Sequence, residues 1–294
     1  MRYQATAVQY LKRFYLTNSP MTYHPKEIMQ TAVYLAMKAE DTFHSVRSFA
    51  EKLDVTTESI LASEFLLTQG LRFTFDVRHP FHGLEGGFME LLAFTNGKGE
   101  AGPGVKKSPK ETREEMLDMS PPPGKSKAKD IKEIVIRCQT AHGKAKELLK
   151  TSALLTDAYF LYSPSQLWLS TLLIVDEPLA RFYLDTKLPL TSEVKPKIFT
   201  VLRQCAEMLR SSPATQPDKE EKKELKRIQK KLEQCRNPQK LDLVAINRAQ
   251  KRDPDMNGGD GLGETVAKRR KLEREQSMKE SEDLFGPVLA DKKG

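Results

Sequence analysis

Two apolar segments, each introduced by a proline, most constrain what this chain can fold into. The first begins at Pro25 and the second at Pro164. Proline is favoured at the first position of a helix, because the amide hydrogen that it lacks would have no partner there. In both segments apolar residues recur at helical spacing almost without polar interruption, which indicates helices buried at the centres of domains. These residues are Ile28, Met29, Ala32, Leu35 and Ala36 in the first segment, and Leu167, Trp168, Leu172 and Leu173 in the second.

The two segments indicate an internal repeat. They begin about 140 residues apart, and residues 95–130 between them are rich in Gly, Pro, Lys and Ser and nearly free of large apolar residues. That composition predicts a flexible insertion. Without it the repeating unit has roughly 100 residues, enough for five short helices. We therefore expect an all-α fold with a first unit at residues 1–77 and a second unit at residues 78–211.

Helical spacing predicts three more helices in the first unit, beginning near residues 2, 46 and 57. The apolar faces are Ala7, Val8, Leu11, Phe14 and Tyr15 in the first of them, and Val46, Phe49 and Leu53 in the second. Thr56 or Thr57 would cap the third helix, which is expected to run to about Leu71. Residues 72–77 then alternate aromatic and polar residues, which favours an extended exit from the unit over a short strand.

In the second unit, helices are expected on both sides of the insertion, at residues 81–94 and 131–155. Ser163 and Gln166 enclose Pro164 as a capping box, which predicts the start of the second central helix. A last helix near residues 196–210 would carry on one face Ile198, Val201, Leu202, Cys205 and Leu209.

A charged helix and a tail are expected after the two units. The helix, at residues 219–235 within a C-terminal region at 212–247, has a narrow apolar stripe. Docking of this helix against the two units is favoured over self-association, because two heptads make a poor coiled coil. Residues 248–294 are expected to be a disordered tail, and its KRRK run at 268–271 is either a nuclear import signal or solvated charge. The stripe consists of Leu225, Ile228, Leu232 and Cys235.

The composition predicts a soluble protein with a solvated portion. Hydrophobic residues make up 38% of the chain, which suffices for a core, while charged residues make up 30% and the mean hydropathy is −0.54. The sequence has no run of about 18 apolar residues and no secretory signal, so we expect an intracellular protein with no membrane partner. The net charge of +8 suits nucleic acid, yet residues 1–94 carry nine Lys and Arg against ten Asp and Glu. We therefore expect no direct nucleic-acid contact.

No residues suggest catalysis, a cofactor or a metal ion. The three cysteines, Cys138, Cys205 and Cys235, lack paired spacing and are interpreted as reduced thiols in helices. The five histidines are scattered, and no metal-binding, nucleophile or phosphate-binding motif is present. We therefore predict a non-catalytic binding protein with no catalytic residue, no cofactor and no metal ligand.

Lys38 and Glu64 are the candidate binding residues. Lys38 closes the first apolar helix, and Glu64 lies among the apolar residues of the helix predicted to reach Leu71. A charge in such a place costs several kcal/mol unless an opposite charge or hydrogen bonds replace its water. Either the two residues pair with each other as a structural ion pair, or they form a docking site for another protein, which is the interpretation we favour.

Several segments of the sequence resemble the cyclins, and in particular cyclins of the H type. They are LKRFYLTNS, YHPKEIMQTAVYLAMKAED, ILASEFLLTQGLRFTFDV, LTDAYFLYSPSQLWLSTLL and KLEQCRNPQKLDL, and within them LTDAYFLYSPSQ is the most specific. The resemblance covers residues 3–94 and 131–247 and implies tandem five-helix cyclin boxes. It also implies that the first helix of the first box is missing, because Met1 already falls in the second helix.

The resemblance implies a regulatory subunit of a protein kinase, not an enzyme. In cyclins, the residues that match Lys38 and Glu64 contact the C-helix of a cyclin-dependent kinase and the segment before it. Phe73 and Phe75 match apolar positions that pack on that C-helix. The residues that would support the box from its core are Ile28, Leu35 and Leu67.

The H-type resemblance also implies partners. Such cyclins serve the cyclin-dependent-kinase-activating kinase of transcription factor IIH, which phosphorylates the C-terminal repeats of RNA polymerase II. The implied partners are a cyclin-dependent kinase catalytic subunit, the RING-finger assembly factor of the same complex and the transcription factor IIH core, in the nucleus. Two alternatives stay open: another transcriptional cyclin and, less favoured, a general transcription factor that places twin cyclin-like repeats on promoter DNA.

Overall fold

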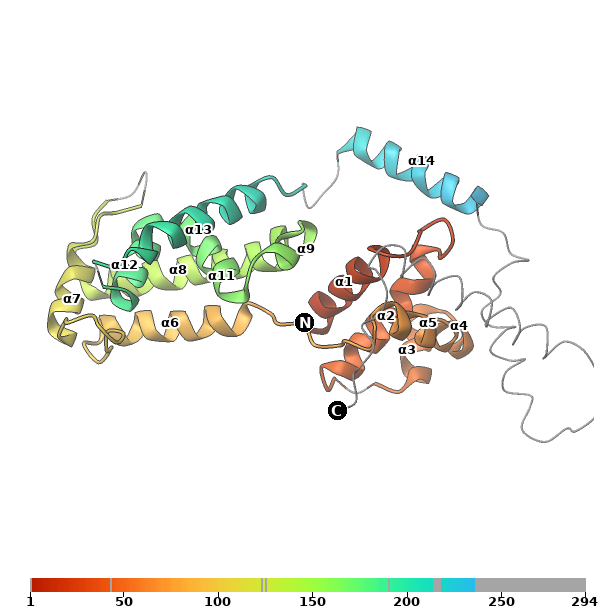
Figure 1. The fold of residues 1–294 in the computed structure, drawn as a ribbon, viewed down its shortest axis with the longest axis horizontal. Coiled ribbons are helices and arrows are strands. Elements are labelled where there is room, and N and C mark those ends of the chain that lie inside the picture. The colour runs from red at the N-terminus through yellow and green to blue at the C-terminus, as the bar shows by residue number, and fades with distance from the viewer. Residues whose placement is uncertain are drawn as a thin grey trace, which may run out of the picture. The chain divides into compact units, whose positions relative to one another are not determined.

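The computed structural model describes residues 2–235 apart from residues 43, 123, 125, 190 and 214–217 (Figure 1). The described residues form helices, turns and irregular segments, and none of them is in a β-strand. The expected all-α class is therefore confirmed. Within the same residues, no helix is both long and apolar enough to cross a lipid bilayer.

The first helical unit is built around one central helix. Its elements are α1 (Arg2–Tyr15), α2 (Pro25–Ala39), α3 (Val46–Leu53), α4 (Thr57–Ala62) and α5 (Glu64–Gly70). Helix α2 packs against α1, α4 and α5, so its apolar sides leave water and form the core of the unit. The core residues around it are Ala7, Tyr10, Phe14, Ile28, Ala32, Leu35, Ala36, Leu67 and Leu71.

The start of α2 is the one predicted from the sequence. Pro25 occupies the first position, and the ring of His24 accepts a hydrogen bond from the amide of Lys26 (3.3 Å). Ile28, Leu35 and Leu67 are buried, as expected. Met29 is exposed instead of buried, because it lies one residue beyond the face that Ile28 and Ala32 turn toward the core.

Other details of the first unit differ from expectation. The helix predicted from residue 57 to about Leu71 is capped by Thr56, as expected, but it is interrupted at Ser63, which separates α4 from α5. Leu53 is exposed, because it is the last residue of α3 and Asp54 then takes a left-handed conformation that ends the helix. On α1 the buried face is centred on Tyr10, and Val8 and Leu11 are half-buried at its edge.

Residues 74–79 leave the first unit as an extended segment without strand pairing, as expected, but the two residues before them form a turn. Arg72 and Phe73 both have positive φ angles, of 52° and 57°. Their amides donate to the carbonyl groups of Gln69 (2.8 Å) and Thr68 (3.0 Å), which satisfies acceptors at the end of α5. This turn fixes the backbone where the extended segment begins.

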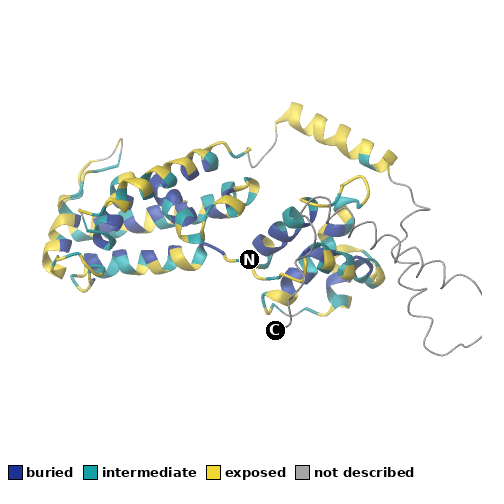
Figure 2. Ribbon diagram, viewed as in Figure 1, coloured by how far each residue is buried: buried dark blue, intermediate teal, exposed yellow. Residues whose placement is uncertain are grey.

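The second helical unit also surrounds one central helix, α11 (Pro164–Val175). Ser163 and Gln166 form the predicted capping box: the amide of Ser163 donates to Gln166 (2.8 Å) and the amide of Gln166 donates to Ser163 (3.3 Å). Helix α11 packs against four neighbours, and the buried residues lie on the facing sides of these helices (Figure 2). The neighbours are α6 (Phe81–Thr95), α8 (Ile131–Lys150), α12 (Glu177–Lys187) and α13 (Val194–Arg210).

Two glycines let α6 approach α11 closely. Gly83 and Gly87 lie one turn apart, and the indole of Trp168 packs on both. A Cβ atom at Gly87 would lie 2.5 Å from Cη2 of Trp168, and one at Gly83 would lie 2.7 Å from Cδ1. Any larger residue at Gly87 would therefore displace the indole from the core.

Residues 95–130 contain a packed helix, which corrects the expectation of a flexible insertion. Helix α7 (Pro109–Asp118) begins with a capping box between Ser108 and Glu111, and it packs on α6 and α8. Thr112 and Met116, four residues apart, are buried there. The sequence SPKE carried this capping signal, but the surrounding Gly and Pro residues concealed it.

Helix α14 (Lys219–Cys235) forms where predicted, but none of its residues is buried (Figure 2). Leu225 and Ile228, expected to dock against the two units, are exposed. The four side chains of the stripe on this heavily charged helix offer too little apolar area to require docking. The remainder of the C-terminal region, the tail and its KRRK run at residues 268–271 lie outside the described residues.

The cysteines carry no bond to one another: Cys138 and Cys205 are buried free thiols and Cys235 is an exposed one. Burial raises the pKa of the Cys138 thiol to about 12, so it remains protonated and unreactive at neutral pH. The two short remaining helices, α9 (Ser152–Leu155) and α10 (Ala158–Leu161), lead from α8 to the start of α11.

A buried ion pair links α8 to the start of α12. Arg137 donates from Nε and Nη2 to the two carboxylate oxygens of Asp176, both at 2.7 Å, and the side chains are 9% and 4% exposed. Asp176 also accepts from the amide of Leu179 (3.0 Å), which caps α12. Removal of either partner would leave the other charge buried without compensation.

We expect Arg137→Ala to lower the free energy of unfolding by about 3 kcal/mol, the usual cost of leaving one buried charge unpaired. Arg181→Ala is the control, because its pair with Glu177 is half exposed and should contribute about 0.5 kcal/mol or less. Urea unfolding of both variants gives the two values. Equal losses would show that burial does not distinguish these pairs.

Candidate functional site

Lys38 and Glu64 form an ion pair at the surface of the first unit. Lys38 lies in the last turn of α2, Glu64 is the first residue of α5, and the ammonium of Lys38 contacts Oε1 of Glu64. The two side chains are 50% and 24% exposed. Each charge also lies at the helix end that favours it, since a C-terminus attracts a cation and an N-terminus an anion. The structure thus brings the two predicted residues together and keeps both accessible.

Phe73, in the turn after α5, and Phe75, on the extended segment, differ in burial. Phe73 is 64% exposed, although its backbone is fixed by the turn at the end of α5. Phe75 is half-buried, because its ring packs edge-on against Tyr10 with 6.3 Å between centroids. The Tyr10 hydroxyl donates to the carbonyl of Phe75 (2.7 Å), and burial raises the pKa of Tyr10 to about 12, so this donor persists at neutral pH.

The surface beside Lys38 is concave. A first depression, of about 350 Å³, is lined by Leu35, Lys38, Ala39, Phe75 and Asp76. A second depression, of about 530 Å³, adjoins the first and continues along the extended segment to His79 and Pro164. We call the two depressions together the docking groove. The first depression is mainly apolar, and the second is lined by charged side chains of both signs.

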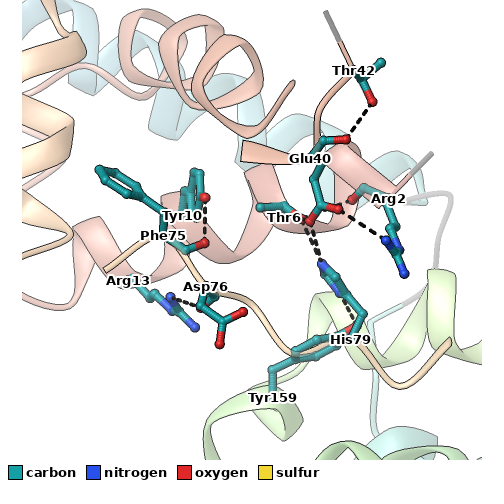
Figure 3. A network of polar contacts seen from close by, with 10 residues as sticks. All are labelled: Arg2, Thr6, Tyr10, Arg13, Glu40, Thr42, Phe75, Asp76, His79 and Tyr159. Atoms are coloured by element: carbon teal, nitrogen blue, oxygen red, sulfur yellow. Dashed lines mark hydrogen bonds and ion pairs between the residues drawn. The ribbon is translucent and has the colours of Figure 1, made fainter. Parts of the chain in front are cut away.

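A polar network that the sequence analysis missed lies along the docking groove (Figure 3). Glu40, the C-cap of α2, accepts a hydrogen bond from the hydroxyl of Thr6 (2.6 Å). Glu40 also lies 3.8 Å from both Nη1 of Arg2 and Nε2 of His79. The same hydroxyl of Thr6 is 2.8 Å from Nε2 of His79, whose Nδ1 is 3.2 Å from the hydroxyl of Tyr159.

The imidazole of His79 is buried, with 3% of its side chain exposed. Burial is the main cause that lowers the pKa of His79 below its ordinary value of 6.5; Arg2, Arg13 and His82 act in the same direction, and Glu40 opposes them. The one sequence signal for this residue was its place before Pro80, where the second unit starts. Among the described residues, no group of three or more histidine, cysteine or acidic side chains is arranged to hold a metal ion.

The second unit matches a known family. The model of the cyclin C-terminal domain fits residues 79–210, from the segment before α6 to the end of α13. Cyclin CCL1 of Saccharomyces cerevisiae is 36% identical over 185 residues, which cover 63% of this chain and 38% of that protein. A chain in the structure of the CAK complex of Chaetomium thermophilum bound to ATP-γ-S is 33% identical, with a TM-score of 0.68, and the match covers 88% of this chain and 73% of that one.

The chain belongs to the cyclin family. A further solved structure, the yeast TFIIK complex of Kin28, Ccl1 and Tfb3, contains a chain that is 32% identical with a TM-score of 0.52, over 70% of this chain and 75% of that one. The predicted resemblance to cyclins is therefore confirmed, although this chain spans only about two fifths of the length of cyclin CCL1. In this cyclin, the docking groove runs from the first helical unit along the segment that leads into the cyclin C-terminal domain.

His79 predicts a pH dependence of folding. Its pKa is lowered in the folded state, so as pH falls below about 6.5 the unfolded chain binds a proton first and the free energy of unfolding decreases. This contribution is complete above pH 6.5 and is lost as pH falls toward the folded pKa. Carboxylates with lowered pKa values, such as Glu85 and Glu177, change the free energy of unfolding only at pH values below about 4.5, the ordinary pKa of a glutamate.

Urea unfolding between about pH 5 and pH 7 measures this slope against His79→Gln, which cannot titrate. We expect a flatter dependence in the variant, whatever its absolute stability. The same slope in both proteins would assign the pH dependence to other groups.

Proposed function

We propose that this cyclin is the non-catalytic regulatory subunit of a cyclin-dependent kinase and activates it by holding the kinase C-helix in its active position. The observation that carries the proposal is the accessible ion pair of Lys38 and Glu64, placed at the docking groove of the first unit. The similar chains from the CAK and TFIIK complexes support it, since both belong to assemblies of the kind that the sequence resemblance implied.

The proposed mechanism is a shift between two kinase conformations. A protein kinase is inactive when its C-helix is displaced, because the glutamate of that helix then cannot pair with the strand lysine that positions the ATP phosphates. A cyclin that binds only the inward conformation increases its population. A shift from 1:99 to 99:1 requires a preference of about 5.5 kcal/mol.

Lys38 and Phe75, which line the docking groove, and their neighbours Glu64 and Phe73 are suited to supply this preference. Lys38 can exchange part of its contact with Glu64 for carbonyl oxygens at a helix end of the kinase, and Glu64 can accept from its amides. Phe73 provides an aromatic anchor whose exposed ring would be buried on binding, and Phe75 contributes the floor beside it. A few such anchors dominate the energy of most protein interfaces.

We extend the proposal to the setting that the sequence resemblance implied. The kinase would be the catalytic subunit of the cyclin-dependent-kinase-activating kinase, joined by the RING-finger assembly factor and the transcription factor IIH core. Its substrates would be the C-terminal repeats of RNA polymerase II, in the nucleus. Affinity capture of the full chain followed by mass identification of its partners tests this setting and distinguishes another transcriptional cyclin.

The charge swap Lys38→Glu with Glu64→Lys tests the interface directly. It should abolish co-purification with the kinase, because each charge then meets the wrong group on the kinase. The swap preserves an ion pair within the cyclin but places each charge at the helix end that disfavours it, so the free energy of unfolding should fall by about 1 to 2 kcal/mol while the chain stays folded. Retained binding together with full kinase activation would contradict the proposed interface.

Phe73→Ala should weaken kinase binding by about thirtyfold, the effect of losing an aromatic anchor worth about 2 kcal/mol. Its effect on folding should be small, since the ring is largely in solvent. Met89→Ala is the matched control, because Met89 has the same exposure of 64% but lies on α6 of the second unit instead of beside Phe75 on the extended segment. Isothermal titration with the purified kinase measures both affinities, and equal affinities would exclude Phe73 as an anchor.

A further inference from the structure

The polar network around His79 forms a chain of hydrogen bonds that crosses from the second unit to the end of α2 (Figure 3). It begins at Tyr159 on α10, passes through His79 on the connecting segment and through Thr6 on α1, and ends at Glu40, the C-cap of α2. The separations are 3.2 Å, 2.8 Å and 2.6 Å. One continuous chain of hydrogen bonds therefore links four elements that are distant in sequence.

Elementary donor and acceptor rules fix the direction of every bond. Glu40 as a carboxylate can only accept, and it lies closer to the Thr6 hydroxyl (2.6 Å) than the carbonyl of Arg2 does (3.3 Å), so the single hydroxyl proton of Thr6 points to Glu40. Thr6 must then accept from His79, which places the imidazole proton on Nε2. Nδ1 is left as an acceptor and receives the hydroxyl proton of Tyr159. Thr6 and His79 each give one proton and receive one, Tyr159 gives one, and Glu40 receives one. The neutral imidazole that this requires matches the lowered pKa of His79.

The chain is also shielded from water. The His79 ring stacks on Phe81 with 5.7 Å between centroids and meets the edge of Tyr159 at 5.8 Å. Burial raises the pKa of Tyr159, so its hydroxyl keeps the proton that it donates. Because little water reaches these groups, a lost partner would not be replaced, and each bond contributes more than an exposed one would.

The chain ends two residues beyond Lys38. Successive residues of a helix differ by 100°, so Lys38 and Glu40 point to nearly opposite sides of the last turn of α2. Glu40 points to the network and Lys38 to Glu64. Whatever holds Glu40 in place therefore also sets the orientation of the turn that presents Lys38.

We propose that His79 is a positioning residue of the docking groove: through Thr6 and Glu40 it ties the last turn of α2 to Tyr159 of the second unit, so that the second unit holds Lys38 in the orientation that a partner meets. The part of this inference that concerns kinase binding rests on the proposed function. The part that concerns the last turn of α2 does not.

Tyr159→Phe in the full chain tests the structural part, because it removes only the terminal hydroxyl. Nitrogen NMR of His79 should show the Nε2–H tautomer in the parent protein. In the variant, hydrogen exchange should become about fivefold faster at the amides of Glu40 and Thr42, which donate to Ala36 and Met37 at the end of α2. Tyr162→Phe is the control, since Tyr162 belongs to the same segment and does not contact His79.

Kinase affinity tests the functional part in a double-mutant cycle of Tyr159→Phe and Thr6→Val. Each change should weaken binding by about fivefold, and the double variant should lose less than the product of the two, because both interrupt the same chain. An Nδ1–H tautomer, or unchanged exchange in Tyr159→Phe, would overturn the inference even if the Lys38 and Glu64 swap abolishes kinase binding. If the swap leaves binding intact while exchange at Glu40 and Thr42 increases, the proposed function fails and the positioning of α2 stands.

Discussion

The whole arrangement depends on the burial of most of one helix in each unit. Helix α2 is covered by α1, α4 and α5, and α11 mainly by α6, α8, α12 and α13, so most of the surface of each helix belongs to the core. Transfer of these apolar surfaces out of water is the dominant favourable term in folding. A helix covered in this way meets solvent mainly near its ends, as at Met29, Lys38 and Ala39 of α2. The candidate site residues of α2 accordingly lie in its last turn and at its C-cap, at Lys38 and Glu40.

The two ends of the central helices differ in the groups that satisfy them. Their N-termini are closed by side-chain caps, His24 for α2 and Ser163 with Gln166 for α11, because unpaired amides next to a core are costly. At the C-terminus of α2, the helix dipole favours a cation, and Lys38 occupies that position while its partner Glu64 uses the N-terminus of α5. The break at Ser63 is what creates this N-terminus. An uninterrupted helix from residue 57 to Leu71 would have left Glu64 in mid-helix without that support.

Local signals in the sequence were sufficient for most of the fold. These signals act within a few residues, so distant contacts do not change what they predict. They are proline at a first helical position, the Ser163 capping box and the spacing of Leu202 and Cys205. The predictions that failed concern segments whose packing depends on contacts with residues distant in the sequence. Thr112 and Met116 make α7 a packed helix only because α6 and α8 lie beside it, and the stripe of α14 finds no cover among the described residues although its spacing suggests one. Composition alone could not distinguish these two cases.

The residues of the candidate site could be identified from the sequence only in part, because some of its signals are local and others depend on the fold. Lys38 and Glu64 were recognisable because a charge at an apolar helix end is unusual in itself, whereas the role of His79 depends on Thr6, Glu40 and Tyr159, which are brought together only by the fold. That dependence has a physical consequence. A contact made by one residue at a helix end can vary without disturbing the core, but a buried chain of donors and acceptors tolerates no missing member, since each unpaired group costs more than the bond it made. The accessible pair can therefore adapt to a partner while the buried chain holds the turn that carries it.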